Sequence, residues 1–142
     1  MTIVVDASVA AKWFLPDEPF TILALELLRM ATIGTANFIV PDLFFSECGN
    51  ILWKAARRQR LSAEETLSAI QVIGELHTVT VAASGLLEPT LQIARNYDRT
   101  FYDSLYIALA VQKKTTLITA DEKLANATAA YLPVKWLGAL QL

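Results

Sequence analysis

Four acidic residues in this chain lie next to segments that we predict to be buried. Asp6 follows a short β-branched run, and Asp121 comes two residues after another such run. Asp103 heads a segment that is apolar on nearly every side, and Glu47 lies at the edge of an apolar helical stripe. Carboxylates that meet at one point cannot all stay ionised unless cations lie among them, and hard divalent ions prefer oxygen ligands. We therefore expect Asp6, Glu47, Asp103 and Asp121 to converge on a site for divalent metal ions.

A site of this kind would suit the hydrolysis of a phosphodiester. Two ions roughly 4 Å apart can hold the attacking and the leaving oxygen, and one of them lowers the pKa of a water. Each acid alone has a simpler explanation. Asp103 and Asp121 could be helix N-caps worth about 1 kcal/mol each, and Glu47 could be a solvated helix residue. The prediction therefore depends on the set of four and not on any single member.

The elements that must position these acids alternate between strands and helices. The expected strands are Thr2–Val5, Phe38–Val40, Thr78–Val81, Thr115–Thr119 and the possible last strand Val134–Trp136. The expected helices cover residues 7–14, 20–31, 42–60, 63–76, 88–97, 103–112 and 122–130. This alternation is typical of an α/β fold with a central parallel sheet of four or five strands. Asp6 and Asp121 would then follow strands at the carboxyl edge, where open α/β sheets carry their sites.

Length and composition exclude several classes of protein. A chain of 142 residues with 54% hydrophobic and 18% charged residues is predicted to form one folded domain, residues 1–142, and not a disordered chain. No apolar run reaches membrane-spanning length, so we expect no membrane partner. Cys48 is the only cysteine, which suits a reducing cytoplasm. The net charge of -2 argues against a nucleic-acid binder. Without the four acids, however, 10 acidic and 12 basic residues remain, so the rest of the surface would be mildly basic if metal ions neutralise those four.

Four segments of the sequence resemble the acidic motifs of PIN domains. They are Val4–Val9, Pro41 with Glu47, Tyr102–Ala110 and Leu117–Asp121. The chain length is similar to that of VapC-type toxins. The resemblance implies a three-layer α/β/α PIN-like fold and a Mg²⁺- or Mn²⁺-dependent endoribonuclease, the toxin of a type II toxin–antitoxin system.

The resemblance also implies roles for individual residues. The acids of the family carry over to Asp6, Glu47, Asp103 and Asp121 as catalytic residues and metal ligands. Its small hydroxyl positions carry over to Ser8 and Thr119, which would orient carboxylates or bound water. Ser104 stands where the family more often has alanine, a difference that we expect to affect packing little.

The family resemblance further implies a small cognate antitoxin and a homodimer. An antitoxin segment would lie in a groove near the site. Five aromatic residues could line such a groove or could equally belong to the core: Trp13, Phe14, Phe44, Phe45 and Trp53.

Seven basic residues are candidates for contact with RNA phosphates. They are Lys12, Lys54, Arg57, Arg58, Arg60, Lys113 and Lys114. The three arginines could simply be the solvated end of a helix. Lys12 and Lys54 lie closest along the chain to Asp6 and Glu47, so we favour these two.

Two other functions are compatible with the sequence. One is a phosphatase that uses Asp6 as nucleophile, although such enzymes usually carry a second acid two residues on, where this chain has Ser8. The other is a non-catalytic PIN-like binding module, against which the presence of all four acids argues. The sequence does not specify the RNA target, the choice of Mg²⁺ or Mn²⁺, or the number of ions.

Overall fold

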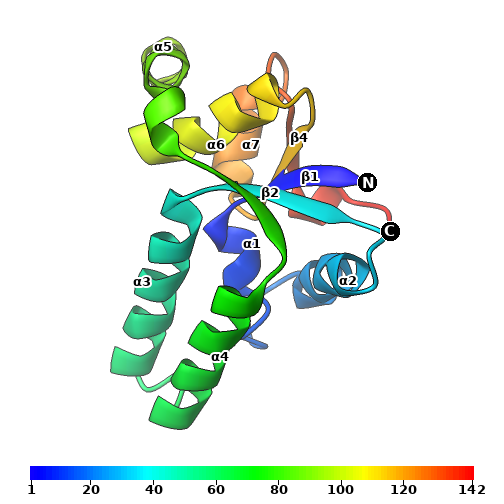
Figure 1. The fold of residues 1–142 in the computed structure, drawn as a ribbon, viewed down its shortest axis with the longest axis vertical. Coiled ribbons are helices and arrows are strands. Elements are labelled where there is room, and N and C mark those ends of the chain that lie inside the picture. The colour runs from blue at the N-terminus through cyan, green and yellow to red at the C-terminus, as the bar shows by residue number, and fades with distance from the viewer.

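The computed structural model describes residues 1–142 and contains a five-stranded parallel sheet (Figure 1). The strands are β1 (Thr2–Val5), β2 (Asn37–Pro41), β3 (Thr78–Val81), β4 (Thr116–Thr119) and β5 (Val134–Trp136). They lie in the order β3-β2-β1-β4-β5, and every neighbouring pair is parallel. The chain moves outward from β1 to β3 and then returns to the other side of β1. This reversal lies between β1 and β4, the position at which open α/β sheets form a crevice at their carboxyl edge.

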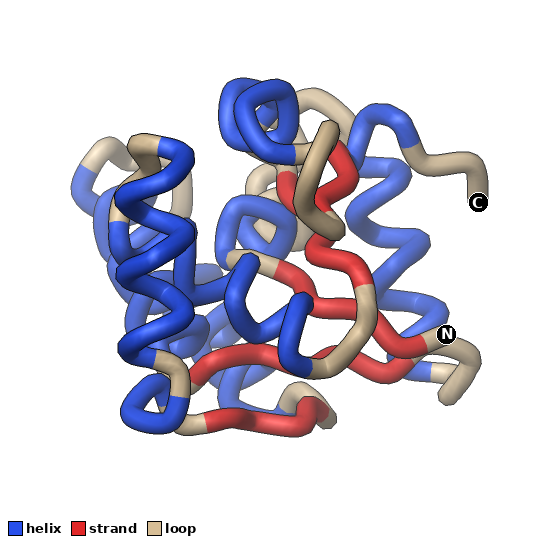
Figure 2. The backbone as a smooth tube through the Cα atoms, turned by 90° about the horizontal axis from the view of Figure 1, so that it is seen from above, coloured by secondary structure: helices blue, strands red, loops and turns tan.

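Helices cover both faces of the sheet. They are α1 (Ala7–Ala11), α2 (Thr21–Thr32), α3 (Leu43–Arg57), α4 (Ala63–Glu75), α5 (Leu87–Tyr97), α6 (Phe101–Gln112) and α7 (Glu122–Thr128), with short 3₁₀ turns at Ala83–Gly85 and Leu137–Ala139. Figure 1 shows α5, α6 and α7 on one side of the sheet and α1 to α4 on the other. Seen from above, the strands run through the centre with helices around them (Figure 2). The predicted three-layer α/β/α fold is confirmed.

The position of β1 at the centre of the sheet follows from its sequence. Ile3, Val4 and Val5 are all buried, as expected for a strand covered on both faces. The helix α6 packs against β1, β2 and β4, and every residue from Ser104 to Ala110 is buried. One core cluster of 33 buried residues joins these elements. The strand and the helix that carry Asp6 and Asp103 are therefore held rigidly.

Several predicted boundaries need correction. The first helix ends at Ala11 and continues only as turns, not to Phe14. The helix α6 begins at Phe101 and not at Asp103, because the side chain of Thr100 caps it by accepting from the N–H of Asp103 at 3.0 Å. The other predicted strands and helices are confirmed to within a few residues at their ends. None of the helices combines the length and the apolar character that spanning a bilayer requires.

Candidate active site

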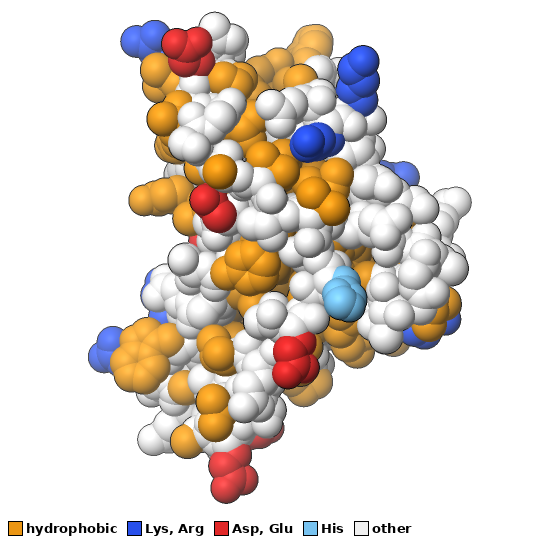
Figure 3. Space-filling model, in the orientation of Figure 1, with side chains coloured by type: hydrophobic (Ala, Val, Ile, Leu, Met, Phe, Trp, Pro, Cys, Tyr) orange, Lys and Arg blue, Asp and Glu red, His pale blue; other side chains and the backbone are white.

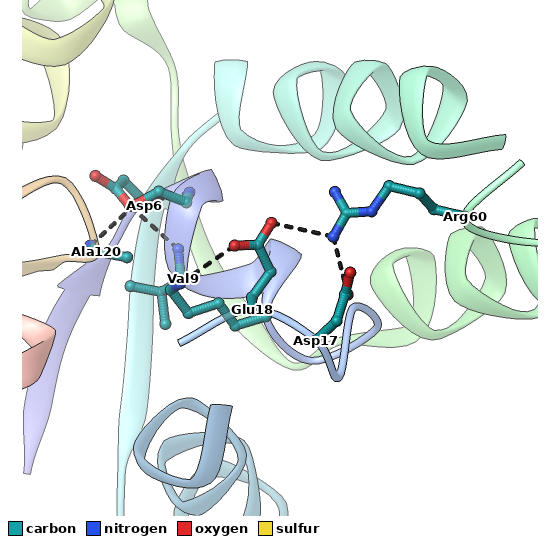
Figure 4. Close-up of polar contacts among 8 residues, drawn as sticks. Asp6, Val9, Asp17, Glu18, Arg60 and Ala120 are labelled. Atoms are coloured by element: carbon teal, nitrogen blue, oxygen red, sulfur yellow. Dashed lines mark hydrogen bonds and ion pairs between the residues drawn. The ribbon is translucent and has the colours of Figure 1, made fainter. Parts of the chain in front are cut away.

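The loop after β1 holds Asp6 in place through backbone and side-chain donors. The Asp6 carboxylate accepts hydrogen bonds from the N–H groups of Ser8, at 3.1 Å, and Val9, at 3.4 Å, and from the Ser8 hydroxyl. Asp6 is thus the N-cap of α1, and only 7% of its surface is exposed. Figure 4 shows its carboxylate beside Val9 and Ala120, at the point where the ends of β1 and β4 meet.

The hydroxyls of Ser8 and Thr119 connect the ends of these two strands. Ser8 Oγ accepts from the N–H of Ala120 at 3.0 Å and lies 3.5 Å from Thr119 Oγ1. Thr119 Oγ1 accepts from the N–H of Asp121 at 3.1 Å, and Asp121 in turn caps α7 by accepting from the N–H of Leu124, also at 3.1 Å. The two predicted supporting residues therefore link the Asp6 carboxylate to the backbone of Ala120 and Asp121.

Glu47 reaches the site from α3 and is held there by a residue that we did not single out from the sequence. The hydroxyl of Tyr106 donates a hydrogen bond to Glu47 Oε1 at 2.6 Å. Tyr106 is only 2% exposed and lies three residues after Asp103, on the same side of α6. The three-residue spacing between Asp103 and Tyr106 indicates from the sequence alone that both lie on one side of α6. Only the packing of α3 near α6 identifies Glu47 as the residue that Tyr106 contacts.

The pKa values indicate that the four acids lie within one electrostatic field. Burial raises the pKa of Asp6 to about 6, with a further contribution from the charge of Asp103. Burial also raises the pKa of Glu47, and the charge of Asp103 again contributes. The pKa of Asp103 is raised by burial first and then by the charge of Asp121, while Thr100 and Arg99 oppose the shift. Asp103 is therefore electrostatically coupled to each of the other three acids.

The donor set at this edge of the sheet fits a hard divalent cation. No group of three acidic, histidine or cysteine side chains is arranged so that it could hold a metal ion by itself. Magnesium, however, commonly takes one or two carboxylates and keeps several waters as its other ligands. Asp6 is buried and Asp103 is partly buried, burial raises the pKa of both, and a cation between the two carboxylates would lower the cost of ionising them.

The two favoured RNA-binding lysines lie in different surroundings. Lys12 is only 8% exposed, and its Nζ is 4.0 Å from Glu18. The same glutamate, together with Asp17, holds Arg60, so these charges are partly balanced within the protein (Figure 4). Lys54 is exposed on α3 and forms no ion pair.

The five aromatic candidates for a groove also divide into groups. Trp13 and Phe44 are buried in the core, Phe14 and Phe45 pack partly buried against it, and Trp53 is exposed. A small apolar crevice between α1, α3 and α4 is lined by seven residues: Ala10, Ala11, Phe14, Cys48, Ile51, Leu52 and Ile73.

Comparison with known proteins decides the family. The sequence model of the PIN domain matches residues 3–130. The chain belongs to the PIN domain family. Ribonuclease VapC3 of Pyrobaculum aerophilum is a PIN-domain relative, 31% identical over 128 residues, or 89% of this chain and 94% of that protein. Ribonuclease VapC9 of Mycobacterium tuberculosis is 33% identical over 133 residues, or 93% of this chain and 95% of that protein.

Solved structures show the same PIN-like fold at lower sequence identity. The protein PAE2754 of Pyrobaculum aerophilum superimposes with a TM-score of 0.72 at 20% identity, over 97% of this chain and 85% of that one. VapC20 of Mycobacterium tuberculosis, described as a toxin that cleaves the sarcin-ricin loop, gives 0.64 at 16% identity, over 89% and 95%. A chain of VapBC2 from Rickettsia felis, bound to a promoter DNA fragment, gives 0.64 at 10% identity, over 96% and 98%.

Proposed function

We propose that this protein is a metal-dependent endoribonuclease, the VapC-type toxin of a type II toxin–antitoxin pair, with residues 1–142 acting as a single PIN domain. The observation that carries the proposal is the position of Asp6 and Asp121 where Ser8 and Thr119 join the ends of β1 and β4, with the charge of Asp103 close enough to raise the pKa of Asp6. Relatives named as VapC ribonucleases match along about nine-tenths of the chain and support the choice of RNA as substrate.

The proposed ligands of Mg²⁺ or Mn²⁺ are the carboxylates of Asp6, Glu47, Asp103 and Asp121. When bound, such an ion would lower the pKa of a water and stabilise negative charge on the leaving oxygen of a phosphodiester. The protein itself fixes the ligands in position. Backbone N–H groups and Ser8 hold Asp6, and the Tyr106 hydroxyl holds one oxygen of Glu47 and leaves the other free.

Ser8 and Thr119 would act as positioning residues. Each hydroxyl accepts from a backbone N–H of the segment 120–121, so the two keep the end of β4 aligned with the end of β1. Alignment of ligands on rigid elements matters because small displacements at a metal site reduce both affinity and rate.

The proposal includes two protein partners. A cognate antitoxin would cover the site in the cell, and a second copy of the chain would form a homodimer. The exposed apolar side chains on α5 and α6, among them Leu87, Leu91 and Tyr102, are suitable for such a contact. We place the protein in the cytoplasm, where Cys48 would remain a free thiol.

The function is tested by replacing Asp6 and Asp103 separately with Asn. We expect each variant to lose metal-dependent RNA cleavage by a factor of at least about 100, and to lose growth arrest on expression. Asp98→Asn is the matched control, because this exposed acid lies at the end of α5, outside the four-acid site. If the wild type and both site variants bind RNA equally and none of them cleaves it, the protein is a non-catalytic binding module and the proposal is wrong. RNA cleavage that both site variants retain would also contradict the proposal.

A further inference from the structure

The C-terminal half of α3 carries a basic surface whose charge is not balanced by the protein. Lys54, Arg57 and Arg58 line a surface hollow of about 320 Å³, and no other residue lines it. The ion pairs of the chain use Lys12, Arg29 and Arg60, so these three cations have no carboxylate partner. A hollow lined only by unpaired cations is suited to a phosphate group.

An exposed aromatic ring adjoins this hollow. Trp53 is 58% exposed, and the guanidinium of Arg57 lies over its ring at 5.8 Å from the centroid. Figure 3 shows basic and hydrophobic side chains next to each other over the lower end of α3. Cations at a helix C-terminus are common because they complement the helix dipole, but the dipole does not account for an exposed indole beside them. Proteins that bind single-stranded nucleic acid combine these two features, since cations hold the backbone and aromatic rings stack on bases.

The surface lies in line with the proposed active site. Glu47, Lys54 and Arg58 are seven and four residues apart, so they share one side of α3. At about 1.5 Å per residue, Lys54 lies about 10 Å along the helix from Glu47. A stacked strand advances about 3.4 Å per nucleotide, so about three nucleotides cover this distance. RNA held at the four acids would therefore reach the hollow a few nucleotides away from the cleaved bond.

We propose that Trp53, Lys54, Arg57 and Arg58 form a binding surface for single-stranded RNA that continues from the active site along α3. Lys54, Arg57 and Arg58 bind phosphates, and Trp53 stacks on a base. This inference rests on the proposed ribonuclease function, which makes RNA the substrate. It extends that function because it names the residues that bind the nucleotides next to the cleaved bond.

The test measures binding and cleavage separately. Binding of a fluorescent, unstructured 20-nucleotide RNA of mixed sequence is followed by anisotropy in EDTA at several salt concentrations. The variant Lys54→Gln/Arg57→Gln/Arg58→Gln should bind at least about tenfold more weakly at low salt. Its log–log salt slope should be smaller by about 2, because each phosphate contact on a single strand contributes about 0.7. Trp53→Ala should lose about fivefold or more in affinity with little change in slope, and Trp53→Phe should recover most of it.

The charge-matched control is Arg29→Gln/Arg95→Gln/Lys135→Gln. It removes three exposed cations that are not RNA-binding candidates, two of which also lie in the last turn of a helix, and it should bind RNA within about twofold of the wild type. If the two triple variants weaken RNA binding equally, or if neither does, the proposed surface does not exist. If the α3 variant binds RNA normally but loses retention on polyglutamate, these cations serve an acidic protein partner and the proposal is overturned.

The cleavage assay distinguishes failure of this inference from failure of the proposed function. With both correct, the α3 variant cleaves RNA with a raised KM and a nearly unchanged kcat. Cleavage with an unchanged KM would contradict the RNA surface and leave the ribonuclease function standing. Loss of binding in the α3 variant, together with no cleavage by the wild type, would support the surface and contradict the ribonuclease function.

Discussion

Tyr106 is the residue on which the position of Glu47 depends. Its buried hydroxyl contacts Glu47 Oε1 at 2.6 Å, and burial together with this bond raises the pKa of the phenol, so that Tyr106 stays a donor. We predict that Tyr106→Phe lowers Mn²⁺ affinity and cleavage about tenfold, because partners that orient metal ligands typically contribute 10- to 100-fold. Calorimetric titration with Mn²⁺ measures the first effect directly.

The control for this prediction is Tyr102→Phe, which removes a hydroxyl from an exposed residue of the same helix. It should leave metal affinity unchanged. Equal affinities for Tyr106→Phe and the wild type would show that Glu47 either needs no support or does not bind the ion.

The buried charge of Asp6 should make the metal-free protein less stable at neutral pH. Burial raises the pKa of Asp6 to about 6 from 3.8 in the native state. The native state therefore holds this proton more tightly than the unfolded state does. The cost of ionising Asp6 is absent below about pH 4, grows as the pH rises, and is fully present above about pH 6. It is on the order of 3 kcal/mol.

We predict that Asp6→Asn, which can still cap α1, raises the free energy of unfolding in EDTA at pH 8 by an amount on the order of 3 kcal/mol. The gain should disappear at pH 4. Urea denaturation at the two pH values measures it, with Asp98→Asn as the control. A variant less stable than the wild type at pH 8 would mean that the Asp6 carboxylate stabilises the fold.

At the residue scale, the four acids could be identified from the sequence, but the side chains that contact them could not. Asp6 and Asp121 could be placed because each follows a β-branched run, and parallel strands end at one edge of a sheet. The contact between Glu47 and Tyr106 spans 59 positions and depends on how α3 and α6 pack, which no local pattern encodes. The pairing of Lys12 with Glu18 was missed for a similar reason, since it depends on the turn between α1 and α2.

Among the elements, α6 has the largest role in positioning the site. It lies against three strands and presents Asp103 at its exposed end. We predict that Leu109→Ala, at a position with no exposed surface, lowers the free energy of unfolding by about 2 to 5 kcal/mol. Val111→Ala, at an exposed position two residues on, should cost less than about 0.5 kcal/mol. Chemical denaturation compares the two, and similar losses would show that α6 is not a core helix.

The strands were easier to predict than the helix ends. Runs such as Ile3–Val5 are recognisable because buried parallel strands consist of β-branched residues. The start of α6 was placed two residues late because Asp103 is itself a good capping residue, whereas the structure uses Thr100. The end of α1 was placed late because its apolar pattern continues into the turns that bury Trp13.

On the scale of the whole molecule, the apolar surface of α5 and α6 should determine the oligomeric state. Leu87 and Leu91 lie one turn apart on α5 and are both about half exposed. We predict that Leu91→Glu converts the proposed homodimer into a monomer, because a buried, unpaired charge is costly at an interface. Light scattering coupled to size exclusion measures the mass. The control Ile22→Glu introduces the same charge at a still more exposed position on α2 and should remain dimeric.

Crystals soaked in Mn²⁺ show whether the carboxylates at the β1/β4 edge bind a divalent ion. We expect an anomalous difference peak in contact with the carboxylates of Asp6 and Asp103, which disappears in Asp103→Asn. A wild-type protein that cleaves RNA but shows no bound ion at this edge, or binds its ion elsewhere, would contradict metal-dependent cleavage by these acids.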